Sequence, residues 1–143
     1  MTVGTEPFRF PVRVYYEDTD AAGVVYYANY LRYMERARTE WLAAHGFDLA
    51  EVEREHGVAF AVARAEVDYL APARLIERLD VTVAPVELGR ARFTVVQTVE
   101  RGGTTLVRAR VTLVCIDRAA WRPARIPAAI AARMKSSLME PPG

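Results

Sequence analysis

The chain has 143 residues, of which 52% are hydrophobic and 26% are charged, a composition typical of one folded domain rather than of a disordered segment. Its 19 basic and 18 acidic residues give a net charge of +1, which excludes a general electrostatic attraction to nucleic acid or to an anionic membrane surface. The single cysteine, Cys115, excludes an intramolecular disulfide and predicts a buried thiol in a reducing compartment.

No segment reaches about 18 uninterrupted apolar residues, and the first residues lack the pattern of a secretory leader. We therefore expect a cytoplasmic protein without a membrane span. No repeat or linker divides the sequence, so residues 1–143 are predicted to form one domain.

The first predicted elements are a strand and a long helix. Residues 8–16 alternate loosely between apolar and polar, and Pro11 favours the edge of a sheet. Residues 28–45 have helical periodicity, and Gly46 is placed to end the helix in a left-handed conformation. The stripe expected to face the core consists of Tyr30, Met34, Ala37, Trp41 and Ala44.

The second half of the chain is predicted to be mostly strands. After a short helical turn over 48–56, residues 58–70 place alanines on one face at a spacing of two, which is expected to let the helix approach closely. Three further strands, over 78–86, 90–100 and 104–117, are joined by turns whose glycines suit a positive φ. These strands are therefore expected to be consecutive and antiparallel.

A short terminal helix is expected over 127–137, because Pro127 suits a first helical turn. One long helix and one antiparallel sheet of five strands bury their apolar faces when the sheet curls around the helix, so the predicted fold class is α+β. Apolar residues at both alternating sets of positions in 104–117 indicate that a second copy of the chain covers part of the sheet. We therefore expect a homo-oligomer.

The segment YYEDTDAAGVVYYANYL, residues 15–31, places Asp18 and Asp20 two positions apart just before the helix. Three interpretations fit these residue types. DTDAAG matches the start of a calcium loop, but Ala22 and Asn29 stand where further ligands are needed, and two histidines with one cysteine support no zinc site, so no metal is predicted. Alternatively, the acids are only turn formers and helix caps.

The third interpretation is catalysis. A helix that begins around 26–28 leaves backbone N–H groups unpaired and directs the positive end of its dipole at a developing oxyanion. Asp20 lies eight residues before Ala28, too far to cap that helix, and an apolar run separates them. We therefore expect the Asp20 carboxylate to face a partly desolvated site beside the helix entrance.

Residues 15–42, YYEDTDAAGVVYYANYLRYMERARTEWL, closely resemble the signature of hotdog-fold acyl-CoA thioesterases of the 4-hydroxybenzoyl-CoA thioesterase type, in particular the branch associated with the bacterial Tol–Pal system. RAEVDYLAPARL (64–75), VELGRA (86–91) and TLVCID (112–117) are similar to the same branch, so the resemblance covers nearly the whole chain. It implies the hotdog fold, in which an antiparallel sheet wraps one long helix, and the order of the predicted elements indicates the same arrangement.

The resemblance implies hydrolysis of an acyl-CoA thioester to a free acid and CoA, with Asp20 as nucleophile or general base and the backbone N–H of Tyr27 as oxyanion donor. Tyr27 stands where the Tol–Pal branch usually has histidine, and 4-hydroxybenzoyl-CoA thioesterase itself has tyrosine, which favours an aromatic acyl group. Asp18 is expected to fix the loop. The resemblance also implies a homodimer or homotetramer with active sites between subunits, and suggests an association with the Tol–Pal system or lipid synthesis.

Coenzyme A is part of the substrate, so no separate cofactor is expected, but its phosphates require cationic contacts. The candidates are Arg90, Arg92 and Arg125, against the alternative that each is a solvated surface charge. Two other functions fit the fold. A hotdog dehydratase needs a histidine paired with an acid, which His45 and His56 offer poorly, whereas a non-catalytic acyl-CoA-binding or scaffold protein needs neither.

Overall fold

The computed structural model describes residues 6–140 of the predicted single domain. Five long strands form one antiparallel sheet in the order β1-β3-β4-β5-β2, and a two-residue strand, β6, pairs with β5. The strands are β1 Phe8–Arg13, β2 Val58–Tyr69, β3 Arg78–Leu88, β4 Arg92–Arg101, β5 Thr104–Asp117 and β6 Arg122–Pro123. The helices are α1 Asn29–Ala44, α2 Leu49–His56 and α3 Ala128–Ser136, preceded by a 3-10 turn over Tyr16–Asp18.

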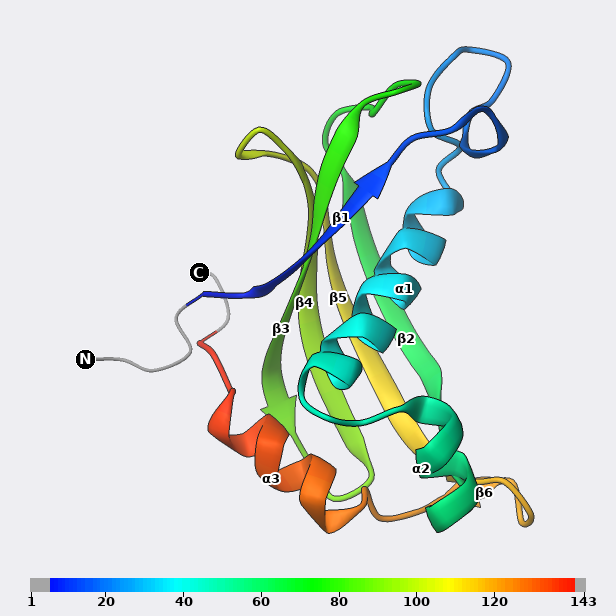
Figure 1. Ribbon diagram of the computed structural model, residues 1–143, viewed down its shortest axis with the longest axis vertical. Helices are drawn as coiled ribbons and strands as arrows, with labels where there is room; N and C mark the ends of the chain where they lie inside the picture. Colours follow the sequence, from blue (N-terminus) through cyan, green and yellow to red (C-terminus); the bar gives the residue numbers. More distant parts are fainter. Residues whose placement is uncertain (1–5, 141–143) are drawn as a thin grey trace.

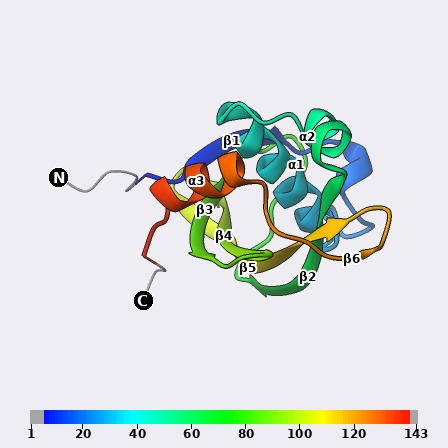
Figure 2. The same ribbon diagram turned by 90° about the horizontal axis from the view of Figure 1, so that it is seen from below.

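The sheet curls around α1, and this curvature defines the architecture. Seen from below, the strands form a curved wall with α1 on its inner side, as Figure 2 shows. The loop before α1 lies at the upper end of the molecule, whereas α2, α3 and β6 lie at the lower end (Figure 1). The predicted α+β class, with five strands wrapped around one long helix, is confirmed. Within residues 6–140, no helix is long and apolar enough to span a membrane.

Helix α1 buries most of the predicted stripe. Four of its five members are buried, but Ala44 is exposed, and Tyr33, which the stripe omits, is completely buried. Gly46 ends the helix with φ at +93°, the left-handed conformation that the sequence predicts. Pro11 lies in β1, an edge strand, where its missing N–H costs no ladder hydrogen bond.

The predicted alanine face of β2 is wrong, because a β-bulge interrupts the strand. The register against β5 shifts between Val62 and Arg64, with Ala63 as the extra residue. Alternate positions therefore change faces at the bulge, so Phe60 before it and Val67 after it both pack against the core. Helix α1 makes its main sheet contacts with β1 and β3 instead of β2.

The two predicted glycine turns differ from each other. Gly102 and Gly103 have φ values of +55° and +86°, as expected for the turn between β4 and β5. Gly89, between β3 and β4, has no positive φ. Its N–H donates to the carbonyl of Arg92 at 2.7 Å, and a Cβ would lie 3.3 Å from that oxygen, so close approach is the reason for glycine here.

Strand β5 does not need a second chain to cover it. Both alternating sets are buried within the single chain: Leu106, Val114 and Ile116 belong to one set, and Val107, Val111 and the thiol-bearing Cys115 to the other. The argument from β5 for a homo-oligomer is therefore wrong. The exposed apolar edge is β2, where Val62 remains 51% exposed.

Candidate active site

Asp18 is the buried acid of the pair and holds the loop before α1. One carboxylate oxygen accepts a hydrogen bond from the N–H of Tyr15 at 2.9 Å, and the other accepts from the side-chain amide of Asn29 at 2.8 Å. The carbonyl of Asp18 accepts from the N–H of Tyr26 at 2.8 Å. Asp18 therefore fixes both ends of the loop, as expected from the sequence.

Asp20 is exposed at the tip of the same loop. Its N–H donates to the carbonyl of Val24 at 2.9 Å and its carbonyl accepts from Gly23 at 3.0 Å, so the chain turns back on itself. Gly23 permits this turn with φ at +82°. Oδ1 of Asp20 accepts from the N–H of Ala22 at 2.8 Å, and Oδ2 has no hydrogen-bond partner within residues 6–140. The predicted desolvated environment is absent from the single chain.

The start of α1 carries unused hydrogen-bond donors. The N-cap residue, Ala28, offers no side-chain acceptor, and the first turn contains no acid. In the described part of the chain, the N–H groups of Tyr27 and Ala28 have no acceptor, whereas that of Tyr26 is taken by Asp18. Two N–H groups and the positive end of the helix dipole thus face the same region, which favours a bound oxyanion.

A strap of residues 70–77, between β2 and β3, supports this end of the helix. The N–H of Val25 donates to the carbonyl of Ala73 at 2.9 Å. The N–H of Ala73 in turn donates to the hydroxyl of Tyr30, in the first turn of α1, at 3.0 Å. Loop, strap and helix are therefore joined by consecutive hydrogen bonds.

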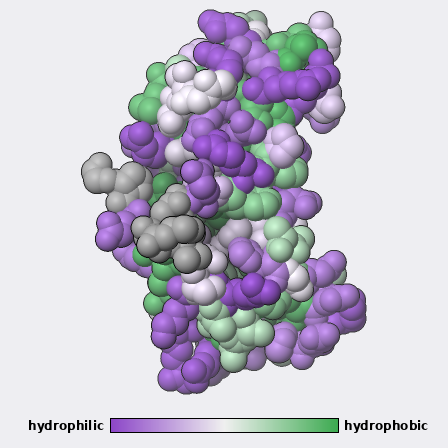
Figure 3. Space-filling model, turned by 60° about the vertical axis from the view of Figure 1, so that its left-hand side comes forward, coloured by the Kyte–Doolittle hydropathy of each residue, from purple (hydrophilic) through white to green (hydrophobic). Residues whose placement is uncertain are grey.

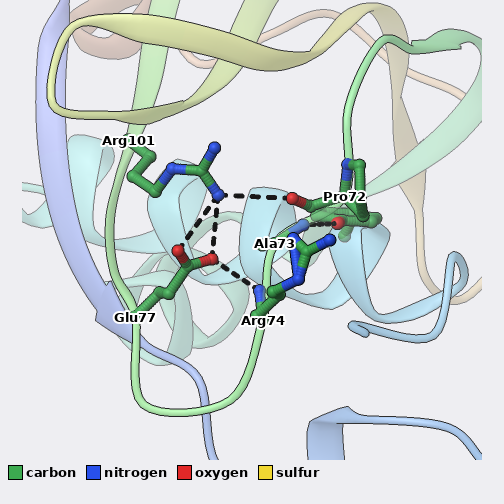
Figure 4. Close-up of polar contacts among 6 residues, drawn as sticks. Pro72, Ala73, Arg74, Glu77 and Arg101 are labelled. Atoms are coloured by element: carbon green, nitrogen blue, oxygen red, sulfur yellow. Dashed lines mark hydrogen bonds and ion pairs between the residues drawn. The ribbon is translucent and has the colours of Figure 1, made fainter. Parts of the chain in front are cut away.

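Arg101, at the end of β4, binds two residues of the strap, as Figure 4 shows. Its guanidinium lies 2.9 and 3.1 Å from the two carboxylate oxygens of Glu77 and donates to the carbonyl of Pro72 at 3.3 Å. Glu77 also accepts from the N–H of Arg74 at 2.6 Å. The strap is thus fixed to the end of β4, which limits movement of the loop that carries Asp20.

Two tyrosine side chains pack against the ring of Tyr27. The ring centroid of Tyr27 lies 4.8 Å from that of Tyr26 and 6.1 Å from that of Tyr69, whose hydroxyl donates to the carbonyl of Tyr27 at 3.4 Å. Burial raises the pKa of Tyr30 and of Tyr69, so both are neutral hydroxyls near pH 7. A cavity of about 280 Å³ is lined by Val25, Tyr27, Tyr30, Tyr69, Leu70, Ala71 and Pro72.

A larger groove of about 570 Å³ runs between α1 and the sheet, next to β2. Apolar side chains from both elements and several charged side chains of α1 form its walls. The lining residues are Leu31, Arg32, Glu35, Arg36, Arg38, Val62, Ala65 and Val111. The groove begins one turn after Tyr27, so a group held at the helix start can extend into it.

Tyr33 places a hydroxyl in the core beneath the loop. Burial raises the pKa of Tyr33, and the neighbouring Asp18 carboxylate raises it further. Within the described chain this hydroxyl has no partner of good hydrogen-bond geometry. Tyr33 and Asn29 are four residues apart on one face of α1, and this spacing is the one sequence signal that connects them to Asp18.

The three candidate CoA-binding arginines lie together but far from Asp20. Arg90, Arg92 and Arg125 are exposed, and the carbonyl of Arg90 accepts from the N–H of Ile126 at 2.9 Å, which joins their two segments. These segments are at the lower end of the molecule in Figure 1, and the loop with Asp20 is at the upper end. The 16 residues of α1 alone span about 24 Å, so a single chain does not unite the two sets.

Next to β1, a separate cavity of about 280 Å³ is lined by residues that include Phe8, Trp41 and Val83, away from the start of α1. On the part of the face that is coloured in Figure 3, hydrophobic side chains alternate with hydrophilic ones. The exposed large apolar residues concentrate instead around the helix start, the strap and β2, and include Tyr26, Tyr27, Leu31, Val62, Tyr69 and Leu70.

A curled antiparallel sheet around one long helix, with free N–H groups where that helix begins, defines a hotdog-fold protein. Residues 14–134 match the model of the Thioesterase-like superfamily, and the chain belongs to this superfamily.

Known relatives agree with this assignment. Acyl-CoA thioester hydrolase YbgC of Escherichia coli O6:H1 is 41% identical over 134 residues, which cover 93% of this chain and 99% of that protein. The 1,4-dihydroxy-2-naphthoyl-CoA hydrolase of Thermosynechococcus vestitus is 34% identical over 125 residues, or 87% of this chain and 86% of that protein. The crystal structure of a probable thioesterase from Bartonella henselae superposes with a TM-score of 0.81 at 33% identity, covering 85% of this chain and all 100% of that one.

Proposed function

We propose that this chain hydrolyses acyl-CoA thioesters to a free acid and CoA. The observation that carries the proposal is the pair of free N–H groups at the uncapped start of α1, beside a loop that presents the exposed Asp20 carboxylate. The relatives named as acyl-CoA thioester hydrolase and 1,4-dihydroxy-2-naphthoyl-CoA hydrolase support this reaction class.

In the proposed mechanism, the thioester carbonyl oxygen accepts a hydrogen bond from the N–H of Tyr27, which stabilises the negative charge that develops on it. Asp20 either attacks the carbonyl carbon to form a mixed anhydride, which water then cleaves, or removes a proton from an attacking water. The carbon–sulfur bond breaks and CoA leaves as a thiolate. Because a thiol of this kind has a pKa of about 8.5, departure needs no strong general acid.

An aromatic acyl group fits the surroundings of the carbonyl site best. The rings of Tyr27, Tyr30 and Tyr69 line the adjacent cavity and offer edge and face contacts to a flat ring. One relative is named for a bicyclic aromatic acyl-CoA. Tyr27, in place of the histidine usual in the Tol–Pal branch, also favours an aromatic acyl group. An association with the Tol–Pal system or with lipid synthesis stays a prediction.

A homodimer formed along β2 would complete the site. β2 is an edge strand whose outer N–H and C=O groups have no ladder partner in the described chain, and Val62 on it is 51% exposed. The strand leads from the lower end of the molecule to the upper end (Figure 1). If two copies pair antiparallel there, the end that carries Asp20 in one subunit lies beside the lower end of the other.

This arrangement gives the three arginines a role. Arg90, Arg92 and Arg125 of one subunit would lie near the end where Asp20 of the partner subunit acts, so they would meet the phosphates of the CoA held there. No ion pair among residues 6–140 involves any of the three, which leaves their guanidinium groups available. Pairing into a tetramer is a further prediction of the resemblance.

Thiol release from a panel of acyl-CoA esters tests the proposed function. The panel comprises short aliphatic, long aliphatic, 4-hydroxybenzoyl and 1,4-dihydroxy-2-naphthoyl esters, with the Asp20→Asn variant as control. We expect turnover of the aromatic esters and a loss in kcat on the order of 10² or more in the variant. Tight binding of CoA esters without thiol release would instead support the non-catalytic acyl-CoA-binding or scaffold function.

A further inference from the structure

Ala73, in the strap of residues 70–77, links the two parts of the candidate site. Its carbonyl accepts a hydrogen bond from the N–H of Val25, at the end of the loop that carries Asp20, at 2.9 Å. Its own N–H donates to the hydroxyl of Tyr30, in the first turn of α1, at 3.0 Å. The carboxylate belongs to the loop and the free N–H of Tyr27 belongs to the helix start. The position of Ala73 therefore determines how these two groups lie relative to each other.

The backbone of the strap is strained at Ile76. Its φ is +73°, in the left-handed region where a β-branched side chain crowds the backbone, and the residue is 53% exposed, so burial does not offset the strain. Hydrogen bonds impose this conformation. The N–H of Ile76 donates to the carbonyl of Val14 at 2.9 Å, and the N–H of Glu77 donates to the carbonyl of Arg74 at 3.2 Å. A strained segment keeps its conformation only while such contacts hold it, so the strap would relax if they weakened.

The ion pair between Glu77 and Arg101 holds the strap on both sides of Ala73, as Figure 4 shows. Arg101 donates to the carbonyl of Pro72, the residue before Ala73, at 3.3 Å. Glu77 accepts from the N–H of Arg74, the residue after Ala73, at 2.6 Å. The two side chains are only 37% and 27% exposed, so solvent screens the pair incompletely. The pair thus fixes the peptide groups on either side of the linking residue.

Building on the proposed thioesterase function, we propose that Arg101 and Glu77 are positioning residues for the reaction. Through Ala73, the pair holds the Asp20 carboxylate in place relative to the N–H of Tyr27. Neither charged side chain lines the tyrosine cavity or the groove beside β2, so neither acts on the substrate directly. A displacement of about 1 Å between reacting groups can cost on the order of 10²-fold in rate, whereas a partly exposed ion pair contributes little to stability. The pair therefore affects kcat more than it affects folding or substrate binding.

The test is steady-state thiol release by the Arg101→Met variant, with the best ester of the acyl-CoA panel. We expect kcat to fall by about tenfold or more and KM to stay within about threefold. The melting temperature should change by no more than about 5 °C. Arg9→Met is the matched control, because it removes an ion pair of the same 2.9 Å length, with Glu100, that touches no residue of the strap. This control should keep the parent kcat.

A double variant shows whether the two charges act together. Glu77→Gln removes the charge but keeps an oxygen that can accept from the N–H of Arg74. If the pair acts as a unit, the variant that combines Glu77→Gln with Arg101→Met should lose no more activity than the weaker of the two single variants. A combined loss equal to the product of the single losses would contradict the proposal. So would a loss of kcat in Arg101→Met that accompanies a fall of more than about 10 °C in melting temperature, which would assign the pair to folding alone.

Amide hydrogen exchange separates this inference from the proposed function, because it requires no turnover. In Arg101→Met, the N–H groups of Val25 and Ala73 should exchange about tenfold faster or more, whereas Arg9→Met should leave both rates unchanged. Faster exchange in a protein that releases thiol from no ester would support the positioning role while rejecting hydrolysis. Hydrolysis with unchanged exchange and an unchanged kcat in Arg101→Met would overturn the inference alone.

Discussion

The side-chain amide of Asn29 donates to Oδ1 of Asp18 at 2.8 Å, and this bond ties the first residue of α1 to the loop that precedes it. Both residues are buried, so water does not compete for the bond. Because the loop also carries Asp20, the bond fixes the position of the exposed carboxylate relative to the free N–H of Tyr27. Two acids of identical chemistry thus have different tasks.

Because the two acids have different roles, the same substitution at each should change the free energy of unfolding by very different amounts. Asp18→Asn should lower the free energy of unfolding by about 2 kcal/mol or more, because an amide cannot accept from both Tyr15 and Asn29. Asp20→Asn should change it by less than about 0.5 kcal/mol, because the side chain is exposed and an amide oxygen can still accept from Ala22. Urea unfolding of both variants measures the contrast, and equal losses would contradict it.

A conservative change at Tyr27 separates its backbone from its phenol. If only the N–H acts, Tyr27→Phe should keep kcat within about twofold, because the ring contacts with Tyr26 and Tyr69 do not need the hydroxyl. Steady-state thiol release measures the change. A loss of tenfold or more at unchanged KM would assign the phenol a part in the transition state.

The arginine cluster predicts a difference between full and truncated substrates. Arg90→Ala should raise KM for an acyl-CoA by about fivefold, as expected for an exposed contact to a phosphate, and should spare the matching pantetheine thioester, which lacks the nucleotide. Raising the salt concentration should reduce the difference. Equal changes in KM for the two esters would argue against a phosphate contact.

Tyr33 predicts a loss of stability at alkaline pH. Burial and the Asp18 carboxylate raise the pKa of Tyr33 above its ordinary value of 10.0, so the folded chain holds this proton more tightly than the unfolded chain. The resulting stabilisation is fully present below pH 10 and is lost as the pH rises toward the folded-state pKa. Between about pH 9 and pH 12, the free energy of unfolding of the Tyr33→Phe variant should therefore fall less steeply with pH than that of the parent protein. Tyr16→Phe, at a hydroxyl-bearing residue that is 80% exposed, should keep the parent slope.

The proposed dimer predicts a defined change in mass. Val62→Arg places a charge on the exposed edge strand and should shift sedimentation from dimer toward monomer at micromolar concentration. Trp121→Arg changes an apolar residue that is even more exposed, at 71%, in the turn before β6, and should leave the mass unchanged. If both variants sediment like the parent chain, β2 is not the interface.

Most of the fold could be predicted because its signals are local. Helical spacing over 28–45, period-two runs and turn glycines specify elements that the structure reproduces within a few residues. The curvature of the sheet around α1 follows from the need to bury one apolar face of each. The burial of Tyr33 was not predicted, because it depends on the loop that contains Asp18 and not on helical spacing alone.

The site was only partly predictable. The loop and the helix start were identified, but the burial of Asp18 and the exposure of Asp20 depend on Asn29 and on the strap from residues 70–77, which is distant in sequence. Likewise, Arg101 resembles any surface arginine in the sequence, because its partner Glu77 lies 24 residues earlier. Contacts between separate segments, rather than residue type, decide these roles.

The bulge takes Ala63 out of the regular alternation of β2. It therefore determines which side chains before and after it point to the same face of the sheet. Val62 and Ala65 are three positions apart, yet both line the groove beside α1. In an uninterrupted strand, residues at odd separations point to opposite faces. If Ala63 instead took an ordinary place in the strand's alternation, Val62 and Ala65 would point to opposite faces, and the polar set that includes Arg64 and Glu66 would turn toward the helix. The bulge that accommodates Ala63 therefore decides which residues of β2 form the wall of the groove.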